Sequence, residues 1–108
     1  KSHRKLEIQN ATKHAIITPF KVMEASYEAM KIMKEMSKIG NPNSVTDACV
    51  GALCARTAVI GAFLNVKINC GDYEDKSFVN NIIEKGNDLV KKTNILEKEI
   101  MKITNSKI

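Results

Sequence analysis

The stretch from Gly40 to Asn69, GNPNSVTDACVGALCARTAVIGAFLNVKIN, constrains the fold of this chain more than any other. Small and amide side chains recur in it at alternating steps of three and four residues, which places them along one side of an α-helix. They are Ala48, Gly51, Ala55, Ala58, Ala62, Asn65 and Asn69. Larger apolar residues cover most of the remaining surface. The pattern therefore predicts a central, buried helix that another helix approaches closely.

The residues at the ends of this segment predict where its helix begins and what precedes it. Gly40 is expected to end an earlier helix, and Asn43 or Ser44 is expected to cap the start of the central one. Asp47 then falls in the first helical turn, where a carboxylate suits the helix dipole. Capping and dipole stabilisation are therefore sufficient structural roles for these side chains.

The flanking segments also predict helices. Residues 4–39 have a helix-forming composition with a break near Thr18 and Pro19, where Pro19 is expected to start or kink a helix. Asp75 is a plausible N-cap for a last helix, whose apolar row runs through Val79, Ile82, Gly86, Leu89, Thr93, Leu96, Ile100 and Ile103. No segment has a residue pattern that predicts a β-strand instead of a helix. The sequence predicts an all-α bundle of long helices.

The small residues of the central helix also predict a partner from outside these three helices. The flanking helices have amphipathic faces of their own to bury, so the partner is expected from absent sequence or from a second copy of the chain. The first turns resemble the middle of a helix, which suggests a piece of a longer chain. We therefore expect the bundle to be part of an intertwined helical dimer.

Composition and charge narrow the class of protein. The chain has 108 residues, of which 44% are hydrophobic, enough for one domain with a modest core. Arg56 interrupts the longest apolar run, so the sequence predicts a soluble protein without membrane contact. The net charge of +5 is spread over mixed-sign stretches, and aromatic residues are few. Nucleic-acid binding is therefore not expected, whereas an anionic small ligand remains possible.

The three cysteines and the polar residues give few catalytic signals. Cys49, Cys54 and Cys70 have no CxxC spacing, which argues against disulfides and a zinc site and favours the cytoplasm. No familiar catalytic motif is present, and His14 is expected to be a packed or exposed histidine rather than a catalyst. Arg56 either reaches solvent, pairs with a carboxylate or awaits an anionic ligand, the first two being favoured.

Asn65 and Asn69 are the stronger polar candidates because they lie one helical turn apart on the same face. Buried amides need hydrogen-bond partners, so they either bridge to a neighbouring helix or chain, or bind a heterocyclic ligand. The residues alone leave both alternatives open.

The central stretch, followed by a short acidic loop and Phe78, resembles the cyclodeaminase and cyclohydrolase family of folate enzymes. The resemblance runs from about Ala11 to about Ile103, and its most specific parts are Gly40-Asn41, Thr46-Asp47 and Asn65-Val66-Lys67-Ile68-Asn69. Thr46 stands where the family typically has Ser, and either hydroxyl can serve a helix start.

The resemblance implies an all-helical homodimer that acts on the one-carbon unit of tetrahydrofolate, without a metal. Residues 1–108 would be the C-terminal helical part of the domain, whose upstream helices, including the aspartate usually assigned to catalysis, are absent. Among the matching positions, Asp47 is the candidate for proton transfer. Asn41, Asn65 and Asn69 are the candidates for substrate binding.

The sequence thus predicts a cytoplasmic folate enzyme, of the type that hydrolyses methenyltetrahydrofolate to formyltetrahydrofolate. Two alternatives stay open: a formiminotetrahydrofolate cyclodeaminase, which releases ammonia, and a helical dimerisation module without catalysis. In both reactions a tetrahedral carbon forms between two nitrogens, so the expected machinery is an acid or base.

Overall fold

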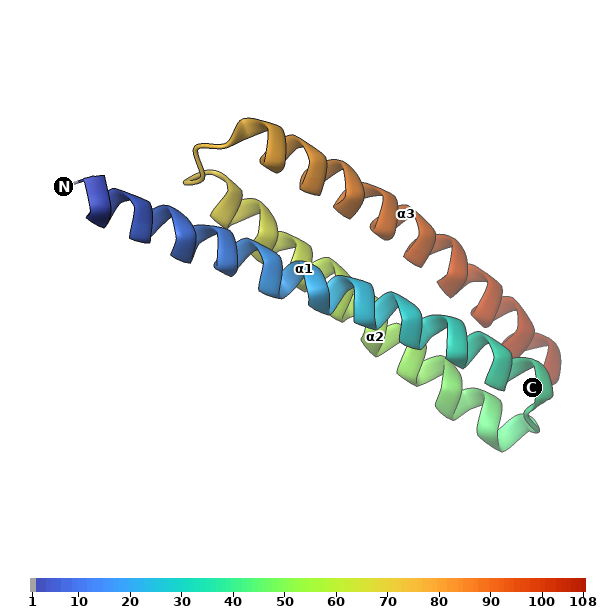
Figure 1. Ribbon diagram of the computed structural model, residues 1–108. Helices are drawn as coiled ribbons and strands as arrows, with labels where there is room; N and C mark the ends of the chain where they lie inside the picture. The colour runs from blue at the N-terminus through green and yellow to red at the C-terminus, as the bar shows by residue number, and fades with distance from the viewer. Residues whose placement is uncertain (1) are drawn as a thin grey trace.

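Three long helices make up the part of the chain that the computed structural model describes, residues 2–108. They are α1 (Ser2–Ile39), α2 (Pro42–Cys70) and α3 (Lys76–Lys107), which run up, down and up in an elongated bundle of 62 × 18 × 16 Å (Figure 1). α1 and α2 pack most extensively along each other, and α3 packs against both. The all-α bundle is confirmed, whereas the homodimer stays a prediction.

The end of α1 is closed by a glycine and by a lysine from the far end of the chain. Gly40 follows the last helical residue, as predicted, and its N–H donates to the carbonyl of Met36 at 2.9 Å. The Lys107 ammonium donates to the carbonyls of Ser37 at 2.8 Å, Lys38 at 2.6 Å and Gly40 at 2.9 Å. Carbonyls at a helix C-terminus lack backbone partners, so this lysine satisfies them and fixes α3 against α1.

The N-cap of α2 is Asn41, so the prediction of Asn43 or Ser44 was wrong. Asn41 Oδ1 accepts the backbone N–H groups of Asn43 at 3.1 Å and Ser44 at 3.0 Å, and Ser44 Oγ accepts the N–H of Asn41 at 3.0 Å. Pro42 occupies the first helical position, where a missing N–H costs nothing. Because the helix starts earlier than expected, Asp47 lies beyond its first turn, which contains no acidic residue.

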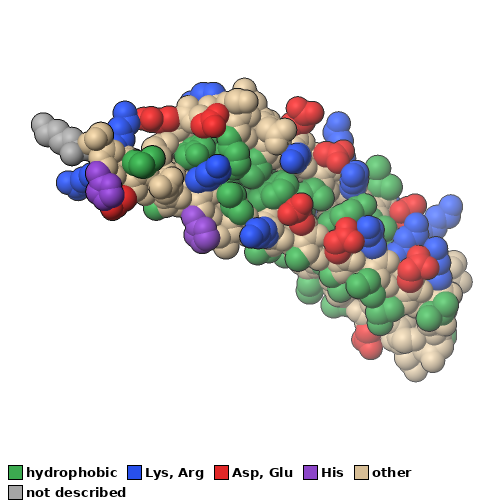
Figure 2. All heavy atoms as spheres, in the orientation of Figure 1, with side chains coloured by type: hydrophobic (Ala, Val, Ile, Leu, Met, Phe, Trp, Pro, Cys, Tyr) green, Lys and Arg blue, Asp and Glu red, His purple; other side chains and the backbone are tan. Residues whose placement is uncertain are grey.

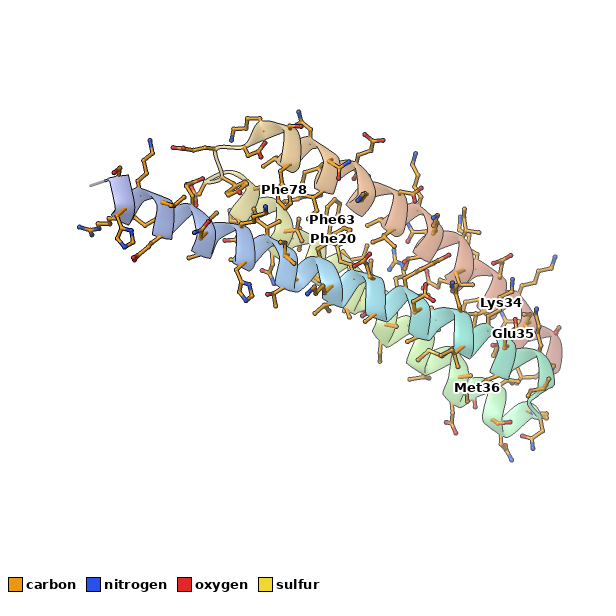
Figure 3. All side chains as sticks on the ribbon, viewed as in Figure 1. Phe20, Lys34, Glu35, Met36, Phe63 and Phe78 are labelled. Atoms are coloured by element: carbon orange, nitrogen blue, oxygen red, sulfur yellow. The ribbon has the colours of Figure 1, made fainter. Side chains whose placement is uncertain are left out.

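The core consists of two clusters of side chains, one toward each end of the bundle. The first contains Ile16, Met23, Val59, Ala62, Phe63, Val66, Cys70 and Ile82, and the second contains Met30, Cys49, Ala52, Leu96 and Ile100. Phe20 of α1 and Phe78 of α3 pack against the first cluster, near Phe63 of α2 (Figure 3). The predicted apolar row of α3 is confirmed, because its members are buried or half-buried. Asp75 caps this helix, accepting the N–H of Phe78 at 3.1 Å.

Arg56 pairs with a carboxylate, which was one of the two favoured alternatives for this residue. Its Nε lies 2.9 Å from Asn94 Oδ1 and 3.1 Å from Glu97 Oε2, so the cation of α2 is turned toward α3. The Arg56 charge therefore lies on the side of α2 that faces α3.

The small-residue row of α2 packs against α1, so its partner does not come from outside. A Cβ on Gly51 would lie 3.2 Å from the methyl group of Met33, which shows how closely α1 approaches. The opposite face of α2 is open within one chain: Val50, Leu64 and Ile68 are 59%, 61% and 73% exposed. The prediction of a helix buried all round was therefore wrong for the single chain, because α1 and α3 cover only one side of α2.

By length and hydropathy alone, α2 could also cross a membrane. Its most apolar window has a mean hydropathy of 1.7, and 33% of that window is buried. Core helices of soluble proteins pass the same test, so this observation is weak evidence for a membrane span. The absence of membrane contact stays a prediction.

Candidate functional site

A groove between α1 and α2 contains two of the predicted site residues. It has a volume of about 580 Å³, and its lining residues are His14, Ala15, Thr18, Pro19, Val22, Asn65 and Asn69. The groove is shallow and open to solvent rather than an enclosed cavity. Asn65 and Asn69 thus lie on one face, as predicted, although Asn65 is exposed and Asn69 is half-buried rather than both being buried.

The Asn69 side chain supplies a hydrogen bond to α1 that Pro19 cannot make. Helix α1 continues through Pro19 without a break, contrary to the expectation that a helix starts there. Because proline has no N–H, the carbonyl of Ala15, four residues earlier, loses its helical donor. Asn69 Nδ2 donates to that carbonyl at 3.3 Å and to the carbonyl of Asn65 at 2.9 Å. Of the two alternatives for Asn69, the bridge to a neighbouring helix is therefore observed.

We expect Asn69→Ala to lower the free energy of unfolding by about 1–2 kcal/mol, because it leaves a partly buried carbonyl unpaired. In a Pro19→Ala background the new N–H can supply the Ala15 carbonyl, so the same substitution should cost clearly less. Urea denaturation of the four proteins of this cycle measures the difference. Equal costs in both backgrounds would show that the amide does not replace the missing backbone donor.

The side chain of Asn65, unlike that of Asn69, makes no hydrogen bond within the described residues. Among residues 2–108 the structure gives a hydrogen bond to its backbone carbonyl, from Asn69, and none to its amide group. An amide can donate to one group of a heterocycle and accept from another. The Asn65 amide is therefore free to bind a ligand.

His14 and Thr18 also line this groove and were missed as site residues by sequence reasoning. They lie one turn apart on α1, and His14 is exposed, consistent with the expectation of a packed or exposed histidine. Only the pairing of α1 with α2 brings them beside Asn65. No Asp or Glu side chain lines the groove, so His14 is its titratable group.

Asn41 and Asp47 do not join the groove within one chain. With a rise of about 1.5 Å per residue, they lie about 36 Å and about 27 Å from Asn65 along α2. Asn41 borders a smaller cavity of about 300 Å³ with Met36 and Ile39, and its Oδ1 is occupied by the helix cap. Asp47 is exposed. Their roles in substrate binding and proton transfer stay predictions.

The remaining reactive groups are not arranged for catalysis in the part of the chain that is described. Burial raises the pKa of the Cys70 thiol, an effect that nearby Lys76 opposes, so this sulfur is held in its less nucleophilic form. Over residues 2–108, no three His, Cys, Asp or Glu side chains gather closely enough to hold a metal ion. Charged side chains of both signs are interspersed over the face seen in Figure 2, without a continuous basic patch.

Comparison with known proteins gives several relatives. The formimidoyltransferase-cyclodeaminase of Dictyostelium discoideum is 29% identical over 104 residues, which cover 96% of this chain and 19% of the relative. The protein of the same name from Rattus norvegicus is 30% identical over 78 residues, or 72% of this chain and 14% of the relative. The methenyltetrahydrofolate cyclohydrolase of Methylorubrum extorquens is 27% identical over 108 residues, all of this chain and 52% of the relative.

The chain therefore spans about half the length of the cyclohydrolase and less than a fifth of the two cyclodeaminases. The profile of the family described as formiminotransferase-cyclodeaminase matches residues 1–88. That match covers most of the chain and includes the groove residues of both helices. The resemblance seen in the sequence is thus confirmed, and the protein belongs to the formiminotransferase-cyclodeaminase family.

Proposed function

We propose that this chain is the C-terminal helical part of a folate enzyme that hydrolyses methenyltetrahydrofolate to formyltetrahydrofolate. The observation that carries the proposal is the uncommitted amide of Asn65, which shares a groove of about 580 Å³ with the imidazole of His14. The substrate class is supported by the cyclohydrolase relative, which is named for methenyltetrahydrofolate. We also propose that the enzyme acts in the cytoplasm as a homodimer, without a metal.

The chemistry of the reaction fits the groups in the groove. The methenyl carbon lies between two nitrogens and is attacked by water, which must lose a proton as the new C–O bond forms. The imidazole of His14 can take part in proton transfer, and the Asn65 amide can hold a polar edge of the pterin ring. Thr18 offers a further hydroxyl. The groove thus combines positioning groups with one titratable group.

The alternative reaction is the cyclodeamination of formiminotetrahydrofolate. It is favoured by the names of the Dictyostelium discoideum and Rattus norvegicus relatives. In this reaction a folate nitrogen attacks the formimino carbon, and ammonia leaves from the same kind of tetrahedral carbon. Both reactions therefore need proton transfer beside the same tetrahedral carbon, so the same groove can serve either reaction.

Asn65→Ala tests this site. If the Asn65 amide binds the substrate, the loss of one hydrogen bond, about 1.4 kcal/mol, should weaken the binding of 5-formyltetrahydrofolate about tenfold. Calorimetric titration measures the affinity. Folding should be unaffected, because the Asn65 side chain is exposed and its backbone carbonyl remains.

The chain offers a matched control for this experiment. Asn80 is an exposed amide that lines a depression of about 560 Å³ on α3. Asn80→Ala should leave the affinity unchanged. A tenfold loss with Asn80→Ala and none with Asn65→Ala would move the folate site to α3 and contradict the proposal.

A further inference from the structure

The amide of Asn69 is fixed in one orientation by two carbonyl groups. Its Nδ2 donates to the carbonyl of Ala15 on α1 at 3.3 Å and to the carbonyl of Asn65, one turn earlier on α2, at 2.9 Å. A carbonyl oxygen only accepts hydrogen bonds, so turning the amide over would place Asn69 Oδ1 against two other oxygens. The nitrogen end of this side chain therefore faces the two carbonyls, and the oxygen end is directed away from them.

The oxygen of the same amide is accessible to a ligand. Among residues 2–108, the structure gives no hydrogen bond to Asn69 Oδ1. The atom is not buried, since Thr93 Oγ1 is the one buried side-chain nitrogen or oxygen atom without a partner in that part of the chain. Asn69 also lines the groove together with His14 and Asn65. The groove thus contains an accessible acceptor in a fixed position.

Pro19 determines what this amide can offer to a ligand. Because proline has no N–H, the Ala15 carbonyl takes one hydrogen of Asn69 Nδ2, and the Asn65 carbonyl takes the other. Both donor hydrogens of Asn69 are thus in use, which leaves the acceptor for a ligand. An amide that donates two hydrogen bonds is polarised, so its oxygen accepts more strongly.

The two amides of the groove therefore have different recognition properties. The exposed Asn65 amide is free to turn, so it pairs with either a donor or an acceptor of a ligand. Asn69 Oδ1 pairs with a donor alone. A ligand that presents an acceptor or a methyl group to this oxygen removes its water without replacing the hydrogen bond. Asn69 is thus the amide that discriminates between ligands.

We propose that Asn69 Oδ1 is a specificity-determining acceptor that selects ligands with an exocyclic amino group, and that Pro19 is the residue that positions it. This inference rests on the proposed function and deepens it by naming the part of the folate that is recognised, the 2-amino group of the pterin. That group projects beyond the ring, which suits it to reach Asn69, the more buried of the two amides. The one-carbon unit, at N5 and N10, lies on the opposite side of the pterin and stays accessible for the reaction.

The binding of two matched compounds tests this selection. They are 5-formyltetrahydrofolate and its 2-deamino-2-methyl analogue, in which a methyl group replaces the amino donor. In the whole enzyme of which this chain is the proposed C-terminal part, calorimetric titration should show about tenfold tighter binding of the amino compound, the usual effect of one hydrogen bond. Asn69→Ala should bring the ratio of the two affinities close to one. A lower folded fraction affects both titrations equally, so it leaves this ratio unchanged.

Two further variants separate recognition from positioning. Asn65→Ala should weaken both compounds by about the same factor and keep the tenfold ratio, because its amide binds another part of the pterin. Pro19→Ala supplies an N–H to the Ala15 carbonyl and frees one hydrogen of Asn69 Nδ2. The amide then turns more readily, so the ratio should fall below that of the wild type. Any lost contact with the proline ring affects both compounds alike, and a proline that only shapes the helix would leave the ratio unchanged.

The outcomes distinguish this inference from the proposed function. A tenfold ratio that survives in Asn69→Ala would overturn the role of Asn69, and a wild-type ratio in Pro19→Ala would overturn the role of Pro19. Equal affinity of the wild type for the two compounds, with weaker binding in Asn65→Ala, would contradict the selection and leave the proposed function standing. A wild-type enzyme that binds neither compound would overturn the proposed function and this inference together.

Discussion

Phe63→Ala should lower the free energy of unfolding by about 3–5 kcal/mol, the usual cost of removing a buried aromatic ring. Phe63 is 4% exposed and belongs to the first core cluster, where helices α1 and α3 both reach it. The ring lies directly over Gly86 of α3, which has no side chain to fill the resulting cavity. The Lys67 ammonium, 4.3 Å from the ring centre, would also lose a cation–π contact.

Chemical denaturation followed by circular dichroism measures this loss. Phe20→Ala is the matched control, because Phe20 is only half-buried at the edge of the same cluster and should cost less. A loss below about 1 kcal/mol for Phe63→Ala would mean that α3 does not pack on α2 as described.

Gly86→Ala has the second largest expected effect, a loss of about 1–3 kcal/mol. A Cβ at Gly86 would lie 2.2 Å from a carbon of the Phe63 ring, well inside van der Waals contact, and the ring is too buried to move aside freely. Alanine favours helix over glycine by about 1 kcal/mol, so the measured loss is what remains after this gain. The helix is thus expected to gain intrinsic propensity while the protein loses stability.

A double variant isolates the steric cause. Phe63→Leu shortens the side chain opposite Gly86, so Gly86→Ala in that background should cost less or even stabilise the protein. The coupling between the two sites is read from denaturation midpoints of the four proteins. Additive effects would show that the alanine methyl group and the ring do not meet.

The helices could be predicted from local pattern, and their ends only in part. The apolar row of α3 and its Asp75 cap follow from residue spacing and side-chain chemistry, which do not depend on the rest of the fold. The N-cap of α2 was misplaced because three consecutive candidates, Asn41, Asn43 and Ser44, compete for it. Their order is decided by Pro42, which prefers the first helical position.

Pro19 shows why tertiary structure was needed to understand α1. From sequence, a proline within a helical pattern predicts a helix start or a kink. The helix continues because a residue far along the chain, Asn69, donates to the carbonyl that proline leaves without a partner. A single sequence does not show which amide reaches which carbonyl, so the continuity of α1 and the structural role of Asn69 could not be derived from it.

The candidate site was predictable in its residue types but not in its assembly. Spacing placed Asn65 and Asn69 on one face, and the structure brings both to the groove with His14. Spacing also shows that Asn41 and Asp47 are several turns away on the same helix, which excludes one common site within a single chain. α1 could pack against either of two rows of α2 residues: the small-residue row that includes Ala48 and Ala62, or the row of larger apolar side chains. The packing of all three helices decides between them, so the spacing of residues in one helix does not predict which row faces α1.

The rate at which methenyltetrahydrofolate loses its near-ultraviolet absorbance measures whether the groove of α1 and α2 supports folate hydrolysis. The assay compares the whole enzyme of which this chain is the proposed C-terminal part, its Asn65→Ala variant and buffer alone, and uses Asn80→Ala as the control for an exposed amide elsewhere. Hydrolysis by the wild type and by Asn80→Ala is expected to run well above the uncatalysed rate, with a clear loss in Asn65→Ala. The same absorbance appearing from formiminotetrahydrofolate would identify the cyclodeaminase reaction. A wild-type rate equal to that of buffer with either substrate would contradict the assignment of folate chemistry to this groove.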